Sequence, residues 1–379
     1  MKILVIQPYF SFNDYNSLFI FNKLKKRGHE IEIASHVQGH DGETLALEDG
    51  HAKIHAIDSL SISIRDHIVD YPFFSMRSFE HVVREVQPDI IHANNLVFFT
   101  TFQSVMLAKR LSIPSVVQVH GVSASRGFFL NEVQRLYLRS FGRSIFRGAS
   151  KVLCLTEGDS REIQGYGCSS NKIVIIPNGV DSEEFKPSCE SEEEGLVLWI
   201  GRFVPEKGLL NLLEALKLMS SQGIMTKNVR VMLIGEGPMV PEVRKFVGKL
   251  GLEDYVQLRG SIRHSDVPVH MNKASIFVLP SLKEGMPFVL LEAMACGKAV
   301  VCSDISGIND VVVNNDNGIL VPAKNPRALS DAISSLLNDS ELRRKLGVNA
   351  RRSIVERHDW NIVVNEVEKV YSQVIEDSL

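Results

Sequence analysis

Two glutamates, Glu284 and Glu292, stand at either end of an otherwise apolar stretch, EGMPFVLLE. A carboxylate near the start of a helix is favourable without any function, so Glu284 has a purely structural explanation. Glu292 is different, because its neighbours are apolar and should be buried, and a lone buried carboxylate is costly. We therefore expect Glu292 to have a bonding partner.

A second group of charged residues lies in GRFVPEKG, where Arg202 and Lys207 follow the predicted strand LVLWIG. Pro205 is typical of a first helical turn, so the amino end of a helix should lie close to both cations. Helix amides together with Arg and Lys can bind phosphate. The alternative is a pair of solvated surface cations.

The two charged groups should meet at one edge of a sheet. If SIFVLP is a strand and Pro287 opens a helix, the amides after Glu284 face the same crevice as the cations. Helical side chains lean toward the amino end, so Glu292 reaches back toward it. A carboxylate suits the vicinal diol of a ribose, and Glu284 would meet a sugar hydroxyl. A diphosphate, a ribose and a hexose in a row make up a nucleotide sugar. The residues predicted to bind it are Arg202, Lys207, Glu284, Gly285, Met286, Pro287, Phe288 and Glu292.

The surrounding elements predict an α/β protein with two doubly wound parallel sheets in tandem. Short Val- and Ile-rich runs without polar alternation are typical of parallel strands covered on both faces. They occur as KILVIQ, IEIAS, DIIHA and SVVQVH, and again as LVLWIG, VRVMLIG, YVQLRG, SIFVLP, KAVVC and GILVP. We predict a Rossmann-like domain over residues 1–178, joined by a final helix at 361–379, and a second Rossmann-like domain over 179–360, which carries the residues predicted to bind the nucleotide sugar.

Composition excludes several classes of protein. The 379 residues are 44% hydrophobic and 23% charged, with a net charge of −3, which argues against a general nucleic-acid binder. No apolar run reaches the roughly 18 residues of a membrane span, and the first residues are typical of a strand rather than of a signal peptide. The five cysteines are odd in number and lack CxxC spacing, which favours reduced thiols in a cytoplasmic protein.

Taken together, these stretches resemble the retaining glycosyltransferase family 4, whose GT-B fold has two Rossmann-like domains facing each other across a cleft. EGMPFVLLE resembles the E-x7-E motif of that family, and GRFVPEKG resembles its Arg/Lys pair. IPNGVDSEEF is similar to its domain junction, IGEGP to a strand and turn of its second domain, and VQVHG to a His-Gly of its first domain. The resemblance runs from about residue 85 to the C-terminus.

The resemblance implies roles for individual residues. Arg202 and Lys207 would hold the diphosphate, Glu292 the ribose and Glu284 a donor-sugar hydroxyl, while His120 would contact the donor sugar near the reacting carbon. It implies transfer of a hexosyl unit from a UDP- or GDP-linked sugar to a hydroxyl of a glycan, glycolipid or small molecule, in cell-envelope polysaccharide or glycolipid synthesis. Fixed cations can stabilise the leaving diphosphate, and no Asp-x-Asp pair is present, so we predict no metal and no other cofactor.

The predicted acceptor side departs from the family. Where the family usually has a Gly-Gly loop after the first strand, this chain has PYFSFNDYNS, so we expect Asn13 and Asn16 to shape a different pocket. His92 follows a strand in the same way as His120, and either lines the acceptor side or is a packed polar residue. After KAVVC the chain has SGIND in place of the family's Gly-Gly and Glu.

A basic stripe is the remaining candidate surface. Four arginines recur every four residues on one predicted amphipathic helix: Arg135, Arg139, Arg143 and Arg147. Arg126 lies just upstream of them. The stripe would either contact anionic lipid at the inner face of the cell membrane or form a solvated, ion-paired helix face. His36, His40, His51 and His55 do not share one helix, and we predict no metal site there.

Three other functions remain as alternatives. A nicotinamide-dependent oxidoreductase needs Gly-x-Gly-x-x-Gly after its first strand, but this chain has QPYFSFND there, and the pair Gly235 and Gly237 is followed by Val240 in the third place. A nucleotide-sugar epimerase could use the same two-domain fold. A catalytically inactive binding protein is disfavoured, because every charged donor-side position is present.

Overall fold

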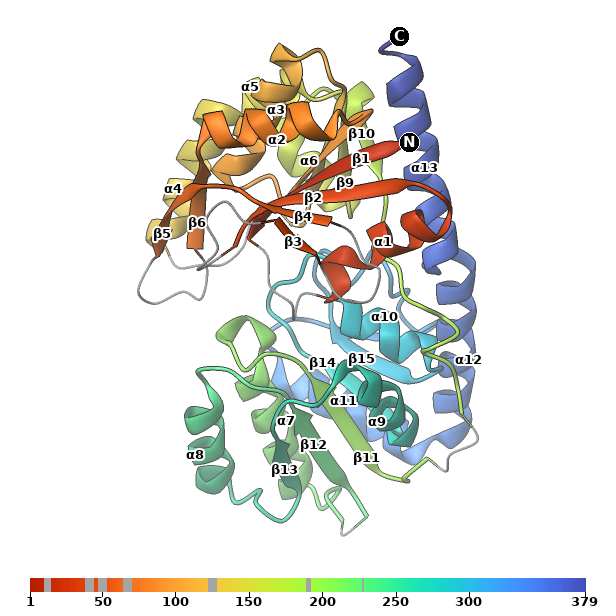
Figure 1. Cartoon of the computed structure of the whole chain (residues 1–379). Helices are drawn as coiled ribbons and strands as arrows, with labels where there is room; N and C mark the ends of the chain where they lie inside the picture. The colour runs from red at the N-terminus through yellow and green to blue at the C-terminus, as the bar shows by residue number, and fades with distance from the viewer. Residues whose placement is uncertain are drawn as a thin grey trace. The chain divides into compact units, whose positions relative to one another are not determined.

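The computed structural model describes residues 1–9, 15–37, 44–46, 53–63, 70–121, 128–188, 192–226 and 228–379. The chain divides into two compact units (Figure 1). Unit 1 comprises Met1–Pro177 together with Val363–Leu379, and unit 2 comprises Asn178–Ile362. The chain therefore leaves unit 1 once and returns to it at its end.

Unit 1 is built on a sheet whose described strands have the order β10-β9-β8-β7-β1-β2-β4-β3. All neighbours are parallel except β3, which is antiparallel to β4. A separate antiparallel pair joins β5 and β6, which the sequence patterns did not predict. The bounds are β1 (Lys2–Tyr9), β2 (Glu30–His36), β3 (Thr44–Ala46), β4 (Lys53–Ala56), β5 (Ser59–Ser63), β6 (Asp70–Phe74), β7 (Ile90–Asn94), β8 (Ser115–Val119), β9 (Lys151–Cys154) and β10 (Ile173–Ile175).

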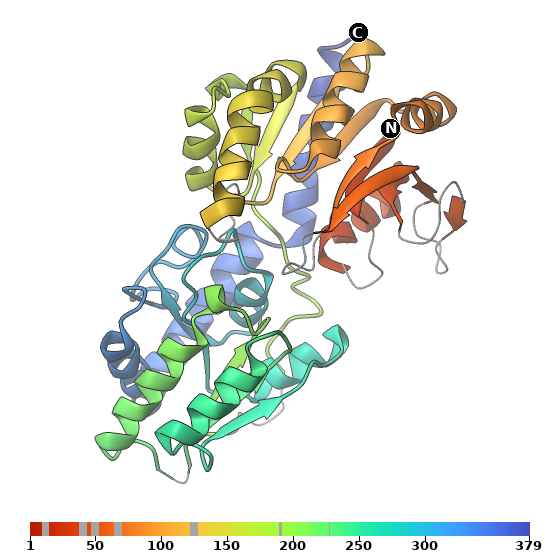
Figure 2. The same cartoon turned by 90° about the vertical axis from the view of Figure 1, so that its left-hand side faces the viewer.

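Helices cover both faces of this sheet (Figure 2). On β7 the side chain of His92 contacts Phe21 and Tyr371, while the neighbouring Ile91 packs with Leu107 on the other side. Burial on both faces explains why these strands lack polar alternation. The helices are α1 (Tyr15–Lys26), α2 (Met76–Val86), α3 (Phe99–Arg110), α4 (Phe128–Tyr137), α5 (Arg143–Gly148), α6 (Glu157–Gly165) and α13 (Trp360–Glu376).

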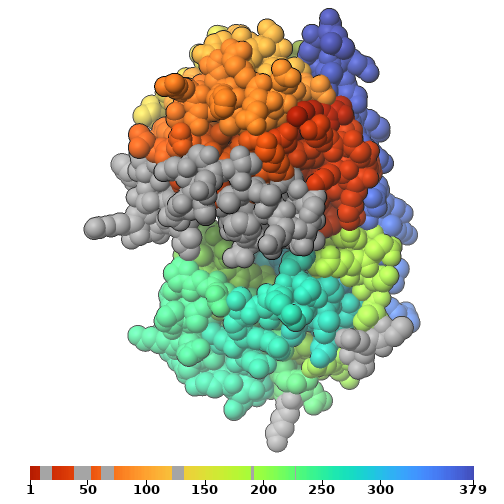
Figure 3. Space-filling view, viewed as in Figure 1, coloured from red at the N-terminus to blue at the C-terminus, as the bar shows by residue number. Residues whose placement is uncertain are grey.

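The last helix, α13, is bound into unit 1 by polar contacts. The hydroxyl of Tyr371 lies 2.6 Å from Nδ1 of His92, and Glu368 pairs with Nε2 of His29 at 2.6 Å and with Arg27. Figure 3 shows the blue C-terminal helix beside the red N-terminal segment. A helix with no strand after it thus completes the unit in which the chain begins.

Unit 2 has a sheet whose described strands are all parallel, in the order β13-β12-β11-β14-β15-β16. Its core includes Trp199, Leu212 and Ile276. The strands are β11 (Leu196–Ile200), β12 (Arg230–Ile234), β13 (Val256–Arg259), β14 (Ile276–Leu279), β15 (Ala299–Ser303) and β16 (Ile319–Val321). The helices are α7 (Leu209–Ser221), α8 (Val240–Leu250), α9 (Val267–Lys273), α10 (Phe288–Ala295), α11 (Pro326–Asn338) and α12 (Ser340–Arg357).

Two further expectations concern the chain as a whole. No helix among the described ranges is long and apolar enough to cross a membrane. The cysteines that the structure describes, Cys154, Cys168, Cys296 and Cys302, are buried and unpaired, and burial raises the pKa of each thiol. Cys189, His40 and His51 lie outside the described residues.

Candidate functional site

The loops that follow β11 and β14 touch each other through their backbones. These strands are neighbours and parallel, so their carboxyl ends lie at the same edge. The amide of Leu282 donates to the carbonyl of Glu206 at 2.7 Å. Gly208 has φ 65°, and a Cβ there would lie 2.0 Å from the carbonyl oxygen of Pro280. Only glycine allows this approach, and it brings the two charged loops together.

Lys207 and Glu284 form the centre of this site. Nζ of Lys207 lies 2.7 Å from Oε1 of Glu284, and the hydroxyl of Ser281 donates to the same oxygen at 2.6 Å. The two charged side chains are only 16% and 10% exposed. Arg202 is exposed and makes no ion pair with any residue of the described ranges. Its guanidinium is therefore open to an anion from solution.

The helix starts in this region only partly match the prediction. Pro205 does not open an α-helix: Pro205–Lys207 is a single 3₁₀ turn, and α7 begins at Leu209. The reason is Gly208, whose left-handed conformation interrupts the helix between the two. Pro287, in contrast, directly precedes α10, as predicted. The amide of Leu290 already donates to the carbonyl of Pro287 at 3.1 Å, whereas the amides of Phe288 and Val289 precede the first intrahelical acceptor.

Neighbouring segments hold the turn before α10 in place. The side-chain amide of Asn178 donates to the carbonyl of Met286 at 2.8 Å, and its backbone amide contacts the Met286 sulfur at 3.3 Å. Gly307, with φ 85°, would place a Cβ 1.8 Å from the carbonyl of Gly285. The SGIND loop after β15 therefore packs against the turn, and Asp310 accepts a hydrogen bond from the Gly307 amide at 2.9 Å.

Glu292 is buried, and it has the partner that its burial required. Nε2 of His264 lies 3.0 Å from Oε1 of Glu292, and this hydrogen bond raises the pKa of His264. The ring of His264 also meets Phe185 edge to face at 5.4 Å. The sequence patterns did not identify His264. It comes shortly after the predicted strand YVQLRG, a position like those of Arg202 and Glu284, which also follow strands.

In unit 1, His120 follows β8 and lies in a chain of polar side chains. Its Nε2 is 2.5 Å from Oδ1 of Asn94, and the amide nitrogen of Asn94 donates to Oε1 of Gln7 at 2.6 Å. Part of His120 is exposed, but the protein packed around the ring disfavours its charged form and lowers the pKa of His120 to about 4. The ring is therefore neutral near pH 7.

His92 is packed in the interior of unit 1. Its side chain is buried, the Tyr371 hydroxyl bonds its Nδ1, and Phe21 packs edge to face against it at 5.1 Å. Burial lowers its pKa to about 3, with a smaller contribution from the charge of His120. Of the two interpretations, the packed polar residue agrees with this position, and an acceptor-side role for His92 stays an untested prediction.

The predicted amphipathic helix with the arginine stripe is broken into three pieces. A π-helical turn at Leu138–Gly142 separates α4 from α5, and it shifts the face that each later residue occupies. Arg135, Arg139, Arg143 and Arg147 are all exposed. Leu136, an apolar residue between the arginines, is 66% exposed, while Arg135 pairs with Glu132. Asn16 lies in α1, and Asn13 and Arg126 lie outside the described residues.

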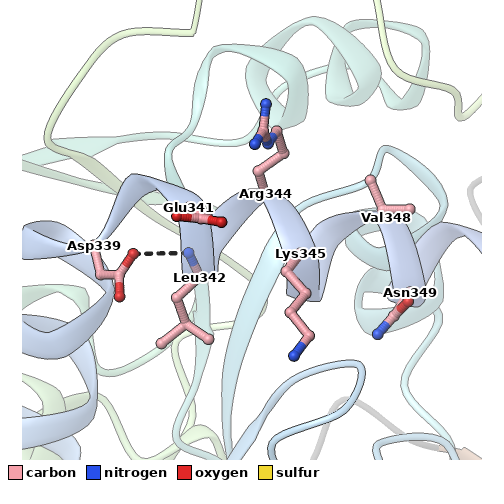
Figure 4. Close-up of a pocket in the computed structure, with 7 residues that line it drawn as sticks. All are labelled: Asp339, Glu341, Leu342, Arg344, Lys345, Val348 and Asn349. Carbon is pink, nitrogen blue, oxygen red and sulfur yellow. Dashed lines mark hydrogen bonds between the residues drawn. The ribbon is translucent and has the colours of Figure 1, made fainter.

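A separate hollow lies on the surface of α12 in unit 2 (Figure 4). Asp339 caps the helix by accepting from the amide of Leu342 at 2.8 Å. The lining residues are Asp339, Glu341, Leu342, Arg344, Lys345, Val348 and Asn349. None of the predicted donor-side residues belongs to this hollow, so it is not the candidate site.

Comparison with solved structures defines the class of protein. The whole chain aligns with the whole of sucrose-phosphate synthase from Thermosynechococcus elongatus at a TM-score of 0.80 and 19% identity. Anabaena HepE in complex with UDP gives a TM-score of 0.81 at 19% identity, over 98% of this chain and 100% of that one. The protein has the GT-B fold, with two Rossmann-like domains.

Sequence comparison then gives the family. The family model described as Glycosyltransferase Family 4 matches residues 20–184, and the one described as Glycosyl transferases group 1 matches residues 180–353. The chain belongs to this glycosyltransferase family. It is 26% identical to an uncharacterized glycosyltransferase of Methanocaldococcus jannaschii over 99% of each chain. It is 29% identical to the N,N'-diacetylbacillosaminyl-diphospho-undecaprenol alpha-1,3-N-acetylgalactosaminyltransferase of Campylobacter jejuni, over 94% of this chain and 95% of that one.

Proposed function

We propose that this glycosyltransferase moves a hexosyl unit from a UDP- or GDP-linked sugar to an acceptor hydroxyl, with retention of the anomeric configuration. The observation that carries the proposal is the placement of Lys207 against Glu284, 2.7 Å apart, on adjacent loops at the carboxyl ends of β11 and β14. Ligands of open α/β sheets bind at this edge.

The diphosphate would lie between the cations and the amino end of α10. Arg202 has no ion-pair partner among the described residues, and Lys207 is held on the neighbouring loop, so both can meet phosphate oxygens. As the bond to the sugar breaks, negative charge grows on the leaving diphosphate. Cations and amide dipoles already in place stabilise that charge without having to reorganise.

The sugar and the ribose would bind the two glutamates. Glu284 receives both Lys207 and Ser281 on Oε1, which leaves Oε2 for a hydroxyl of the donor sugar. Glu292 bonds His264 through Oε1, so its other oxygen suits the ribose diol. From unit 1, neutral His120 would contact the donor sugar near the reacting carbon.

The proposed reaction needs no divalent metal, because Arg202 and Lys207 supply the positive charge that a metal would otherwise bring to the diphosphate. Initial rates measured in 5 mM EDTA and in 5 mM magnesium or manganese should agree within about twofold. Activity that disappears with EDTA and returns only with the metal would contradict this part of the proposal.

We propose a lipid-linked or glycan acceptor, and a place in cell-envelope polysaccharide or glycolipid synthesis. The name of the Campylobacter relative gives a diphospho-undecaprenol-linked acceptor for that enzyme. In this chain, exposed Arg135 and Arg139 lie near exposed Val133 and Leu136 on α4 and the turn after it, which suits peripheral contact with an anionic membrane. Flotation with vesicles of anionic and of neutral lipid tests this contact, and equal recovery with both would exclude it.

The function itself is tested in two steps. A thermal-shift panel of UDP, GDP, ADP and their sugars identifies the donor, because a ligand that binds the native state raises the melting temperature. The labelled donor is then incubated with and without candidate acceptors. A glycosylated product with the donor's anomeric configuration supports the proposal, whereas an inverted product overturns retention. An epimerised free donor would instead identify a nucleotide-sugar epimerase.

A further inference from the structure

Gln7, Asn94 and His120 form a hydrogen-bonded chain across three neighbouring strand ends. Gln7 lies on β1, Asn94 ends β7, and His120 follows β8; these strands are adjacent and parallel. Asn94 bridges the other two residues, at 2.6 Å to Gln7 and 2.5 Å to His120. None of the motifs that place the chain in its family includes Gln7 or Asn94.

Burial restricts how these groups can pair. Gln7 is 7% exposed and Asn94 is 4% exposed, so each donor has to face an acceptor. An amide side chain has one oxygen that accepts and one nitrogen that donates. If the nitrogen of Asn94 donates to the oxygen of Gln7, the oxygen of Asn94 is left to face His120. Nε2 of His120 can bond that oxygen only by carrying a proton.

We propose that Gln7 and Asn94 are positioning residues that fix the tautomer of His120, holding the proton on Nε2 and leaving Nδ1 as a hydrogen-bond acceptor. Which nitrogen of a histidine is protonated is set by the bond that the other groups offer it. Nδ1 makes no hydrogen bond with any residue that the structure describes. It can therefore accept one from a hydroxyl of the donor sugar or of the acceptor.

The catalytic part of this inference rests on the proposed function, in which His120 meets the donor sugar. The tautomer itself does not depend on that function and can be measured without turnover. His92 is the neighbouring titratable group whose charge is coupled to His120, and it is held by Tyr371 rather than by the amide chain. It should therefore not respond to changes at Gln7.

The experiment uses the full-length protein with 15N-labelled histidine. The ring nitrogens of His120 are assigned by comparison with His120→Gln, and their protonation is read from their chemical shifts at pH 7.5. Gln7→Ala frees the Asn94 amide to turn, and we expect Nδ1-protonated ring to appear. Gln7→Glu offers only acceptor oxygens, which compels Asn94 to donate to it, and should keep the proton on Nε2.

Gln103→Ala is the matched control. Gln103 is also 7% exposed, lies in unit 1, and uses its amide to bond the backbone of Phe74 at 2.8 and 3.0 Å. Its loss should lower stability without changing the ring nitrogens of His120. In turnover, Gln7→Ala should reduce kcat by about 10- to 100-fold, the range for partners that orient a ligating histidine, with little change in KM for the donor. Gln7→Glu should keep kcat close to the wild-type value.

The outcomes are separable. A wild-type ring protonated on Nδ1, or a tautomer unchanged in Gln7→Ala, overturns the inference. So does a changed tautomer with unchanged kcat, which removes the catalytic role. If no nucleotide sugar supports transfer while the tautomer responds as expected, the proposed function fails and the positioning role of Gln7 and Asn94 is still supported. Should Gln7→Ala fail to fold, Asn94→Asp provides the test, because a carboxylate beside Nε2 should raise the pKa of His120 and keep the proton there.

Discussion

Nε2 of His264 lies 3.0 Å from Oε1 of Glu292, although the two residues follow strands on opposite sides of the sheet centre. In unit 2, β12 and β11 lie between β13, which precedes His264, and β14, which precedes α10. The segment after β13 therefore passes the ends of two strands to reach the buried carboxylate. The contact satisfies one oxygen of Glu292 and leaves the other for a ligand.

We expect Glu292→Ala to weaken binding of the free nucleoside diphosphate by about 10- to 100-fold, because a hydrogen bond to a charged group contributes about 1.5–3 kcal/mol. Calorimetric titration with UDP and GDP gives the dissociation constants. Glu214→Ala is the control, since Glu214 is exposed on α7. Wild-type affinity in Glu292→Ala would remove the ribose assignment.

Lys207→Ala should act mainly on turnover. Its charge meets a diphosphate that becomes more negative as the sugar leaves, so we expect kcat to fall by about 100- to 1,000-fold with a smaller effect on donor binding. Steady-state kinetics with the donor varied separates the two effects. Lys217→Ala, on the exposed side of α7, should leave both unchanged. An increase in KM with kcat unchanged would show that Lys207 binds the ground state and the transition state equally, and would contradict the prediction.

The His264–Glu292 pair predicts a pH dependence of stability in unit 2. The folded pKa of His264 is raised, so its contribution is fully present below the unfolded pKa of about 6.5 and is lost as the pH rises through the folded value. His264→Gln should therefore be more destabilising at pH 5.5 than at pH 8.5. Trp199 and Trp360 both lie in unit 2, so urea unfolding followed by tryptophan fluorescence measures the free energy of unfolding of this unit. The burial-lowered pKa of His270 predicts the opposite trend for His270→Gln.

Because His92 is buried in its neutral form, we expect the stability of unit 1 to decrease in acid. Its folded pKa of about 3 lies below the unfolded value of about 6.5, so the unfolded chain binds the proton first and stability falls as the pH drops from about 6.5 toward 3. Between pH 7.5 and pH 5, the free energy of unfolding should fall by about 2 kcal/mol, because each pH unit below the unfolded pKa lowers it by about 1.4 kcal/mol. Calorimetry should show a smaller decrease for His92→Gln than for wild type. Exposed His81→Gln is the control, and an equal decrease in all three proteins would contradict the prediction.

The contact between Gly208 and Pro280 can be separated from backbone strain. Gly208 and Gly223 have φ of 65° and 74°, but a Cβ at Gly223 would have nothing within 4 Å, whereas one at Gly208 would lie 2.0 Å from the Pro280 carbonyl. Gly223→Ala should cost about 1 kcal/mol from its left-handed backbone. Gly208→Ala should cost at least about 2 kcal/mol more, because the loops must separate. Equal melting temperatures for Gly208→Ala and Gly223→Ala would show that the two loops can separate without a loss of stability.

The sequence predicts the fold class well because strands covered on both faces leave continuous Val- and Ile-rich runs. The runs KILVIQ, DIIHA and LVLWIG coincide with β1, β7 and β11. The π turn at Leu138–Gly142 was not predicted, since an extra residue in a helical turn leaves the sequence pattern unchanged while it rotates the residues beyond it.

The candidate site was predictable where its residues directly follow a strand. Lys207 and Glu284 could be paired because parallel strands end at a common edge. His264 was not found, because reaching Glu292 depends on the path of the chain beyond β13, and periodicity carries no information about that path. The position of His92 also depended on tertiary packing: its partner, Tyr371, lies far along the chain in α13.

The division of the chain into units has a consequence for how the protein is made. Unit 2 is a single uninterrupted segment, whereas unit 1 lacks α13 until residues 363–379 have been translated. During synthesis on the ribosome, unit 1 is therefore completed after unit 2. Until α13 is made, the side of unit 1 at His92 stays uncovered, while unit 2 can already fold. During that interval, a chaperone that shields apolar surface would have its binding site on unit 1.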